Sequence, residues 1–139
     1  MGAFGVGIFE DDTSLDWIEE EYASGGVEAV RAALDEAADT SAADYLEVDA
    51  GSAARAAAEA VAASFDAGPA IDEDDLERLR EHEEDIAQDD GLIALALRAV
   101  RRITAENSEL AELWTEEEAS AAVWTAEMDG LETRLRGLL

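Results

Sequence analysis

Four carboxylates near the start of the chain come closest to a recognisable chemical site. Glu10, Asp11, Asp12 and Asp16 lie between positions 10 and 16, and hard cations such as Ca²⁺ and Mg²⁺ prefer clustered oxygen ligands. The spacing does not follow an EF-hand loop, and acidic residues also favour a helix N-terminus when no metal is present. We therefore expect Asp12 and Asp16 to bond backbone N–H groups of a first helix. The alternative is a cation site with Asp11, Asp12 and Asp16 as candidate ligands.

Three glycines precede these carboxylates. Phosphate-binding glycine loops need a preceding strand and a following helix N-terminus, and the nearby carboxylates would repel a phosphate. We expect instead that the glycines let aromatic side chains pack on the core, with Gly5 or Gly7 at a positive φ or in close contact with another segment. The predicted structural motif comprises Gly2, Gly5, Gly7, Phe9, Asp12, Asp16 and Trp17.

Other reactive residue types give no support for catalysis. The chain has no cysteine, which excludes disulfides, thiolate metal ligands and cysteine nucleophiles. The one histidine, His82, stands in a run of charged residues, and we expect it to be exposed and structurally idle. No serine is marked as an activated nucleophile. Catalytic residues are therefore unknown, no cofactor is predicted, and the sequence favours a protein without enzymatic activity.

The tryptophans and the basic residues have structural interpretations. Tryptophan is enriched at binding hot spots, but on amphipathic helices it is more often a core anchor, and we expect core positions for Trp17, Trp114 and Trp124. One basic cluster is present, and at its spacing we expect pairing with local carboxylates rather than anion binding. The cluster consists of Arg98, Arg101 and Arg102.

The charge balance is extreme. Thirty-six acidic residues face nine basic residues, which are all arginine, and the net charge is -27. Such a chain repels nucleic acid and anionic membrane surfaces. An excess of acid without lysine favours a protein adapted to concentrated salt over an acidic protein from a GC-rich genome. We find no signal peptide and no apolar run long enough to span a membrane, so we expect a cytoplasmic protein.

Helical periodicity dominates the rest of the chain. Capping boxes are predicted at Thr13–Asp16 and at Thr115–Glu118, and residues 72–90 are predicted to form one exposed acidic helix. Residues 39–49 are predicted to connect two helices while holding Tyr45, Leu46 and Val48 against the core. We expect one compact all-α domain over residues 1–139, with five to seven helices and a short glycine-rich N-terminal segment packed on the core. The expected helices span 13–24, 27–37, 53–65, 72–90, 92–105, 108–114 and 115–135. The last helix is expected to carry its apolar face on Val123, Trp124, Met128, Leu131 and Leu135.

The N-terminal motif resembles that of a known family. The series Gly2-x-x-Gly5-x-Gly7-x-Phe9-x-Asp-Asp12, followed by Asp16-Trp17, resembles the opening of the uncharacterised DUF4259 family of bacteria and archaea. The resemblance continues at Tyr45-Leu46-Glu47, in the following alanine-rich helix and at Ser108-Glu109-Leu110-x-x-Leu113-Trp114. Phe4 stands where the family has Trp, and Asp11 where it has Asn. The resemblance implies a single domain with this motif, and it implies no activity, because none is established for the family.

These observations lead to two functional hypotheses. The first is a non-enzymatic acidic helical protein that acts through protein–protein interaction, with an unknown and possibly basic partner. The second is a divalent-metal-binding module or an enzyme that uses the carboxylates of residues 10–16. Saturable cation binding that is lost in Asp12→Asn and Asp16→Asn would favour the second hypothesis.

Overall fold

The computed structural model describes residues 7–139, and these residues form helices and loops without a β-strand. The predicted all-α class is therefore confirmed for this range. Because α1, η1 and α2 run on without a break, the helices within residues 7–139 are eight in space, one more than the predicted maximum. In chain order the elements are α1 (Asp12–Asp16), the π-helix η1 (Trp17–Tyr22), α2 (Ala23–Gly25), α3 (Val27–Ala38), α4 (Val48–Ser64), α5 (Glu73–Leu79), α6 (Glu83–Ala87), α7 (Gly91–Ile103), α8 (Glu109–Thr115) and α9 (Glu118–Arg136).

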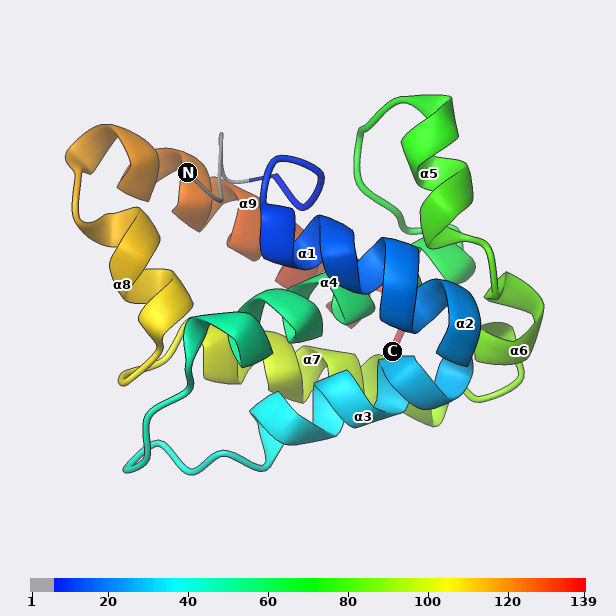
Figure 1. Ribbon diagram of the computed structural model, residues 1–139, viewed down its shortest axis with the longest axis horizontal. Helices are drawn as coiled ribbons and strands as arrows, with labels where there is room; N and C mark the ends of the chain where they lie inside the picture. Colours follow the sequence, from blue (N-terminus) through cyan, green and yellow to red (C-terminus); the bar gives the residue numbers. More distant parts are fainter. Residues whose placement is uncertain (1–6) are drawn as a thin grey trace.

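The central helix is α4. It contacts α1, α3, α7 and α9 along its sides, α8 near its start, and α5 and α6 near its end (Figure 1). Nearly all of its residues from Gly51 to Ser64 are buried, although most of them are alanines. Small side chains allow neighbouring helices to approach closely, so an alanine-rich helix is suited to being surrounded.

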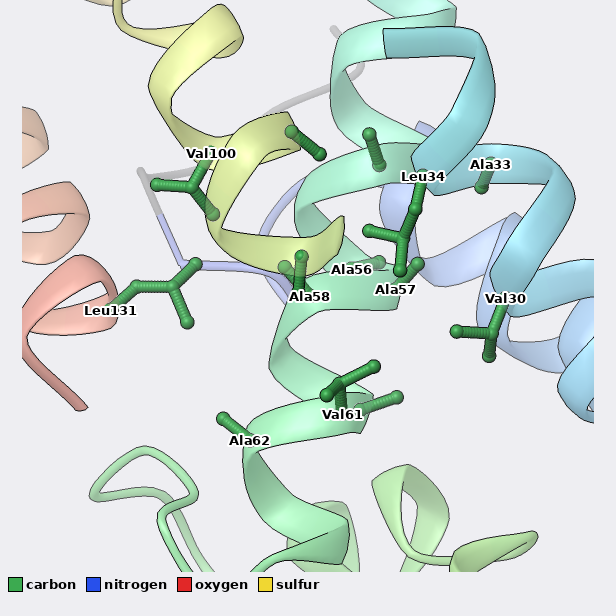
Figure 2. Close-up of a cluster of buried hydrophobic side chains, with 14 of the residues drawn as sticks. Val30, Ala33, Leu34, Ala56, Ala57, Ala58, Val61, Ala62, Val100 and Leu131 are labelled. Atoms are coloured by element: carbon green, nitrogen blue, oxygen red, sulfur yellow. The ribbon is translucent and has the colours of Figure 1, made fainter. Parts of the chain in front are cut away.

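The core around α4 is built from larger side chains on its neighbours. In Figure 2, Val30 and Leu34 of α3 lie on one side of α4, while Val100 of α7 and Leu131 of α9 lie on the other. All four side chains are fully buried. Each neighbouring helix therefore supplies the branched residues, and α4 supplies the surface on which they pack.

The start of α4 differs from the prediction. The helix begins at Val48, five residues before the predicted Ala53. Its N-cap residue, Glu47, makes no side-chain capping bond, and the N–H of Val48 instead donates to Oε1 of Glu109 at 2.9 Å. Because Glu109 belongs to α8, the group that stabilises this helix start is distant in sequence.

The first helical segment contains a π-helical turn. The i→i+5 repeat of η1 brings Trp17 and Tyr22 together, and their rings stack with centroids 5.4 Å apart. Both side chains are buried.

The first helical segment ends, as predicted, at Gly26, whose φ of 57° is in the region that favours glycine. A Cβ at this position would also lie 3.2 Å from Nδ1 of His82.

The acidic stretch is two short helices, not the predicted single helix. Between α5 and α6 the N–H of His82 donates to the hydroxyl of Tyr22 at 3.3 Å instead of continuing the helical ladder. The break lets both Leu79 and Ile86 point into the core, where both are fully buried. A contact with the first helical segment therefore decides how this stretch folds.

Three other predictions about the chain are wrong. Thr115 does not cap the last helix, because its hydroxyl donates to the carbonyl of Ala111 and α9 starts after Glu117 without a side-chain cap. Val123, predicted to face inward, is 52 % exposed. Tyr45, predicted to lie against the core, is 48 % exposed, and its hydroxyl donates to Glu112.

Within residues 7–139, no helix combines the length and apolar character that a membrane crossing requires.

Candidate functional site

An open cleft of about 840 Å³ lies between α4 and α9. Small residues of α9 form one wall, namely Ala122, Ala126 and Gly130. Other walls come from the turn at residues 7–10 and from residues 68–71, which contribute the apolar side chains of Ile8 and Ile71. The cleft is thus assembled from three parts of the chain that are far apart in sequence.

A buried ion pair forms part of the cleft floor. Glu59 of α4 is 2 % exposed, and Arg134 of α9 binds both of its carboxylate oxygens, at 2.8 and 3.3 Å. The same guanidinium donates to the carbonyl of Ala67 at 2.9 Å. Burying a carboxylate is costly unless a partner compensates its charge. Arg134 supplies this compensation and joins α9 to α4 across the cleft.

A second arginine lies beside this pair. Arg55 of α4 is 2 % exposed, and its guanidinium carbon lies 5.3 Å from the ring centroid of Trp124, a cation–π distance. Burial lowers the pKa of the Arg55 guanidinium from its ordinary value, while the negative charges of Glu59, Glu127 and Asp11 oppose this change. The floor thus holds buried charges of both signs, and for Arg55 the effect of burial exceeds the attraction of its carboxylate neighbours.

Two carboxylates at the cleft are engaged only weakly by cations. Glu127 lies 3.9 Å from Nη2 of Arg55, beyond hydrogen-bonding distance, and its side chain is 43 % exposed. Glu10 is exposed and accepts the backbone N–H of Gly7 at 3.3 Å, with no ion pair to any residue of the range 7–139. The described lining therefore has three acidic and two basic residues, and its most exposed charged side chains are the acidic Glu10 and Glu127, since Arg134 is 24 % exposed and bound to Glu59.

The predicted N-terminal motif is positioned by Asp11 rather than by Asp12 and Asp16. Asp11 is 7 % exposed, accepts the N–H of Thr13 at 3.0 Å as the N-cap of α1, and accepts the hydroxyls of Ser14 and Ser52. Asp12 and Asp16 are exposed. A carboxylate one residue earlier than predicted thus caps the helix and joins it to α4.

The aromatic and glycine residues of the motif have mixed positions. Trp17 is 4 % exposed, whereas Phe9 is half-buried against the core. Gly7 has no positive φ, and its nearest contact is the side chain of Glu10 in a local turn. Gly2 and Gly5 lie outside the described residues. Trp17 therefore packs in the core. Phe9 also packs on the core, but it buries less apolar area than a fully buried ring would.

The candidate metal ligands do not come together. Asp11 is occupied by hydroxyl and N–H donors, and Asp16 lines a separate hollow of about 370 Å³ beside Trp17 and Asp49. Across the described range, no three His, Cys, Asp or Glu side chains are placed so that they could hold one ion. A single cation could therefore not be shared by Asp11, Asp12 and Asp16 in this arrangement.

His82 is not the idle surface residue that was predicted. It is half-buried, its ring meets Tyr22 edge to face with centroids 5.1 Å apart, and Nε2 lies 3.2 Å from the carbonyl oxygen of Ala23. Tyr22 in turn donates its hydroxyl to the carbonyl of Leu79. The prediction failed because the ring packs on a distant helix, and the group has a structural role.

The basic cluster separates into two kinds of contact. Arg98 and Arg101 pair with the carboxylates of Asp39 and Glu132 at 3.7 Å. Carboxylate partners were predicted, but these two lie on distant helices or turns and not in the local sequence as expected. Arg102 is 7 % exposed and binds no carboxylate in the described structure; it donates instead to five backbone carbonyls. This guanidinium holds the loops on either side of the bridge between Leu46 and Ser108. The acceptors belong to Thr40, Ser41, Asp44, Glu106 and Asn107.

The tryptophans mostly follow the prediction. Trp17 and Trp124 are buried, and Trp114 is partly buried against the core. Sequence analysis missed the cleft residues Arg55, Glu59 and Arg134. A usable signal was present, because Arg55 and Glu59 are opposite charges four residues apart in a run of alanines, a spacing that places them on one face of the helix.

Comparison with known proteins decides the family. A family model described as domain of unknown function DUF4259 matches residues 2–127. The chain belongs to the DUF4259 family. This agrees with the resemblance of the N-terminal motif, and the matched range includes α4 and most of the cleft, while Gly130 and Arg134 lie beyond it. Neither a curated protein nor a solved structure matches the chain.

Proposed function

We propose that this DUF4259 protein is a non-enzymatic binding module and that its cleft between α4 and α9 receives a segment of a basic partner protein. The observation that carries the proposal is the contrast within the cleft. Its walls are largely apolar and its buried Glu59 is compensated by Arg134, whereas the carboxylates of Glu10 and Glu127 are accessible. Such a surface suits an apolar segment that carries positive charge.

The net charge of the chain supports the same class of partner. A protein of charge -27 attracts basic surfaces and repels acidic ones over several ångströms, and this attraction weakens as salt increases. We propose further that this acidity adapts a cytoplasmic protein to concentrated salt, where close apolar contacts in the cleft would hold a partner after the long-range attraction is screened.

The test uses a variant that fills the cleft without disturbing the fold. An added Cβ at Gly130 meets no atom within 4 Å, so Gly130→Trp should project its ring into the cleft and leave the core intact. Thr125→Trp is the matched control, because Thr125 is an exposed residue of α9 outside the described lining. Both proteins and the wild type would be immobilised and exposed to lysate of the native host.

We expect the immobilised wild type and Thr125→Trp to retain basic proteins from the lysate, and Gly130→Trp not to retain them. Their retention should decrease as KCl is added, because the accessible carboxylates contribute to binding. Equal retention by Gly130→Trp, or recovery of acidic proteins alone, would contradict the proposal. Circular dichroism of the three proteins checks that the substitutions leave the helices folded.

The metal hypothesis is tested separately by calorimetric titration with Ca²⁺, Mg²⁺, Mn²⁺ and Zn²⁺. Saturable binding that disappears in Asp12→Asn and Asp16→Asn would replace the proposal with a metal-binding module.

A further inference from the structure

Gly130 stands in the interior of α9, and the fold of the protein gives no reason for a glycine there. Glycine in a helix interior is less stable than alanine. Gly130 does not have a positive φ, and a Cβ built on it meets nothing within 4 Å. Gly68 is different, because its Cβ would lie 3.2 Å from Cα of Ala63. The missing side chain at Gly130 is therefore unexplained by contacts among residues 7–139.

The place of Gly130 in the cleft offers a reason. Ala122 and Ala126 precede it at intervals of four residues, and all three line the cleft. Residues four apart lie on one face of a helix, so α9 presents little more than backbone along this line. The distance between two packed helices depends on the side chains between them. A helix that approached α9 here could come closer than at any bulkier face.

We infer that the occupant of the cleft is an α-helix of the partner that crosses α9 at Gly130. This inference rests on the proposed function. Binding of an amphipathic helix in a groove is a recurring mode of peptide recognition, and the line of small residues on α9 lets a helix approach closely.

Charge identifies the kind of helix. Glu10 and Glu127 reach the cleft from the N-terminal turn and from α9, so a crossing helix would place Lys or Arg beside them. The other face of this helix must be apolar, so that it packs on Ile8 and Ile71. It must also carry a small residue at the point where it crosses α9. A second copy of this chain fits poorly, because two molecules of charge -27 repel each other. The occupant is a basic amphipathic helix.

The experiment selects peptides and then compares two substitutions at one position. A displayed library of random peptides of about 14 residues, roughly four helical turns, is selected on the wild type with counter-selection on Gly130→Trp. Enriched peptides are synthesised and titrated against the wild type, Gly130→Ala and the control Thr125→Ala. Thermal melts of each free protein are recorded beside the titrations.

We expect the enriched peptides to be basic, to carry apolar residues at helical spacing and to gain helicity when bound. Gly130→Ala should melt at a higher temperature than the wild type, because the helix gains an alanine, and yet bind the peptides about tenfold more weakly, because one methyl group obstructs a close contact. Thr125→Ala should bind as the wild type does.

Two results would overturn the inference alone. They are enriched peptides without helical periodicity, and unchanged affinity in Gly130→Ala while Gly130→Trp still abolishes binding. A different result would remove the proposed function as well: the counter-selection on Gly130→Trp removes every peptide that binds the wild type, so that no peptide distinguishes the two proteins. Because Gly130→Ala is expected to melt at a higher temperature and yet to bind more weakly, a general loss of fold could not be the cause of the weaker binding.

Discussion

Replacing Arg134 by Met tests whether the ion pair under the cleft holds α9 on α4. The substitution keeps a long apolar stem and removes the guanidinium that binds both oxygens of Glu59 and the carbonyl of Ala67. Glu59 cannot turn to solvent, because it is 2 % exposed. Its carboxylate is then left in the interior with Arg55 as the nearest compensating charge that the described structure shows.

The cost follows from this geometry. Removing one partner of a buried ion pair destabilises a protein by about 3–5 kcal/mol. The side chain of Arg134 is 24 % exposed and Arg55 remains nearby, so we expect the lower end, about 3 kcal/mol. In a chain of this size such a loss lowers the melting temperature by roughly 10 °C.

The assay is urea unfolding followed by circular dichroism at fixed salt, with Arg136→Met as the matched control. Arg136 also belongs to α9, but its side chain is 55 % exposed and its Nε lies 3.9 Å from Glu132. Both substitutions make the net charge more negative by one. We expect the control to stay within about 0.5 kcal/mol of the wild type, and Arg134→Met combined with Glu59→Leu to recover much of the loss. A cost for Arg134→Met no larger than that of the control would refute the reasoning.

Three further predictions concern the whole molecule, the first helix and the tyrosines. The melting temperature should rise in molar KCl, because screening relieves repulsion within a chain of charge -27; an unchanged or lower value would contradict this. Asp11→Ala should cost about 2 kcal/mol in urea unfolding, because a helix cap and two hydroxyl partners are lost, whereas the charge-matched Asp12→Ala should change little. Burial raises the pKa of Tyr22 to about 12, and the hydrogen bond to Glu112 does the same for Tyr45. The fold therefore favours the neutral form of Tyr22, so the stability that this group contributes is present below pH 10 and is lost as pH rises from 10 towards 12. Ultraviolet titration of Tyr45→Phe, which leaves Tyr22 as the sole tyrosine, measures this pKa. Ionisation of Tyr22 near pH 10 would contradict the prediction.

Much of the helical architecture follows from local sequence information. The apolar periodicity of α3 and α7 and the alanine content of α4 were sufficient to place these helices, and the glycines at the end of the first helical segment marked its end correctly. Periodicity and helix termination depend on residues within one or two turns, so the sequence contains what is needed to recognise them.

Helix boundaries were lost where a distant residue decides them. Val48 starts α4 because Glu109 accepts its N–H, and the acidic stretch divides because Tyr22 accepts the N–H of His82. In both cases the stabilising partner is separated from the helix by at least one other helix in the chain. No local pattern identifies such a partner before the helices are packed.

The sequence by itself determined the helical class, the family and a surface of strongly negative charge. The tertiary structure alone decided the cleft, since Arg55 and Glu59 on α4 meet Arg134 and Glu127 only after α9 packs on α4. It also decided that Asp11, and not Asp12, is the buried carboxylate of the first helix. The physical reason is the same in each case: helix formation depends on neighbouring residues, whereas the burial and compensation of a charge depend on which distant groups the fold brings to it.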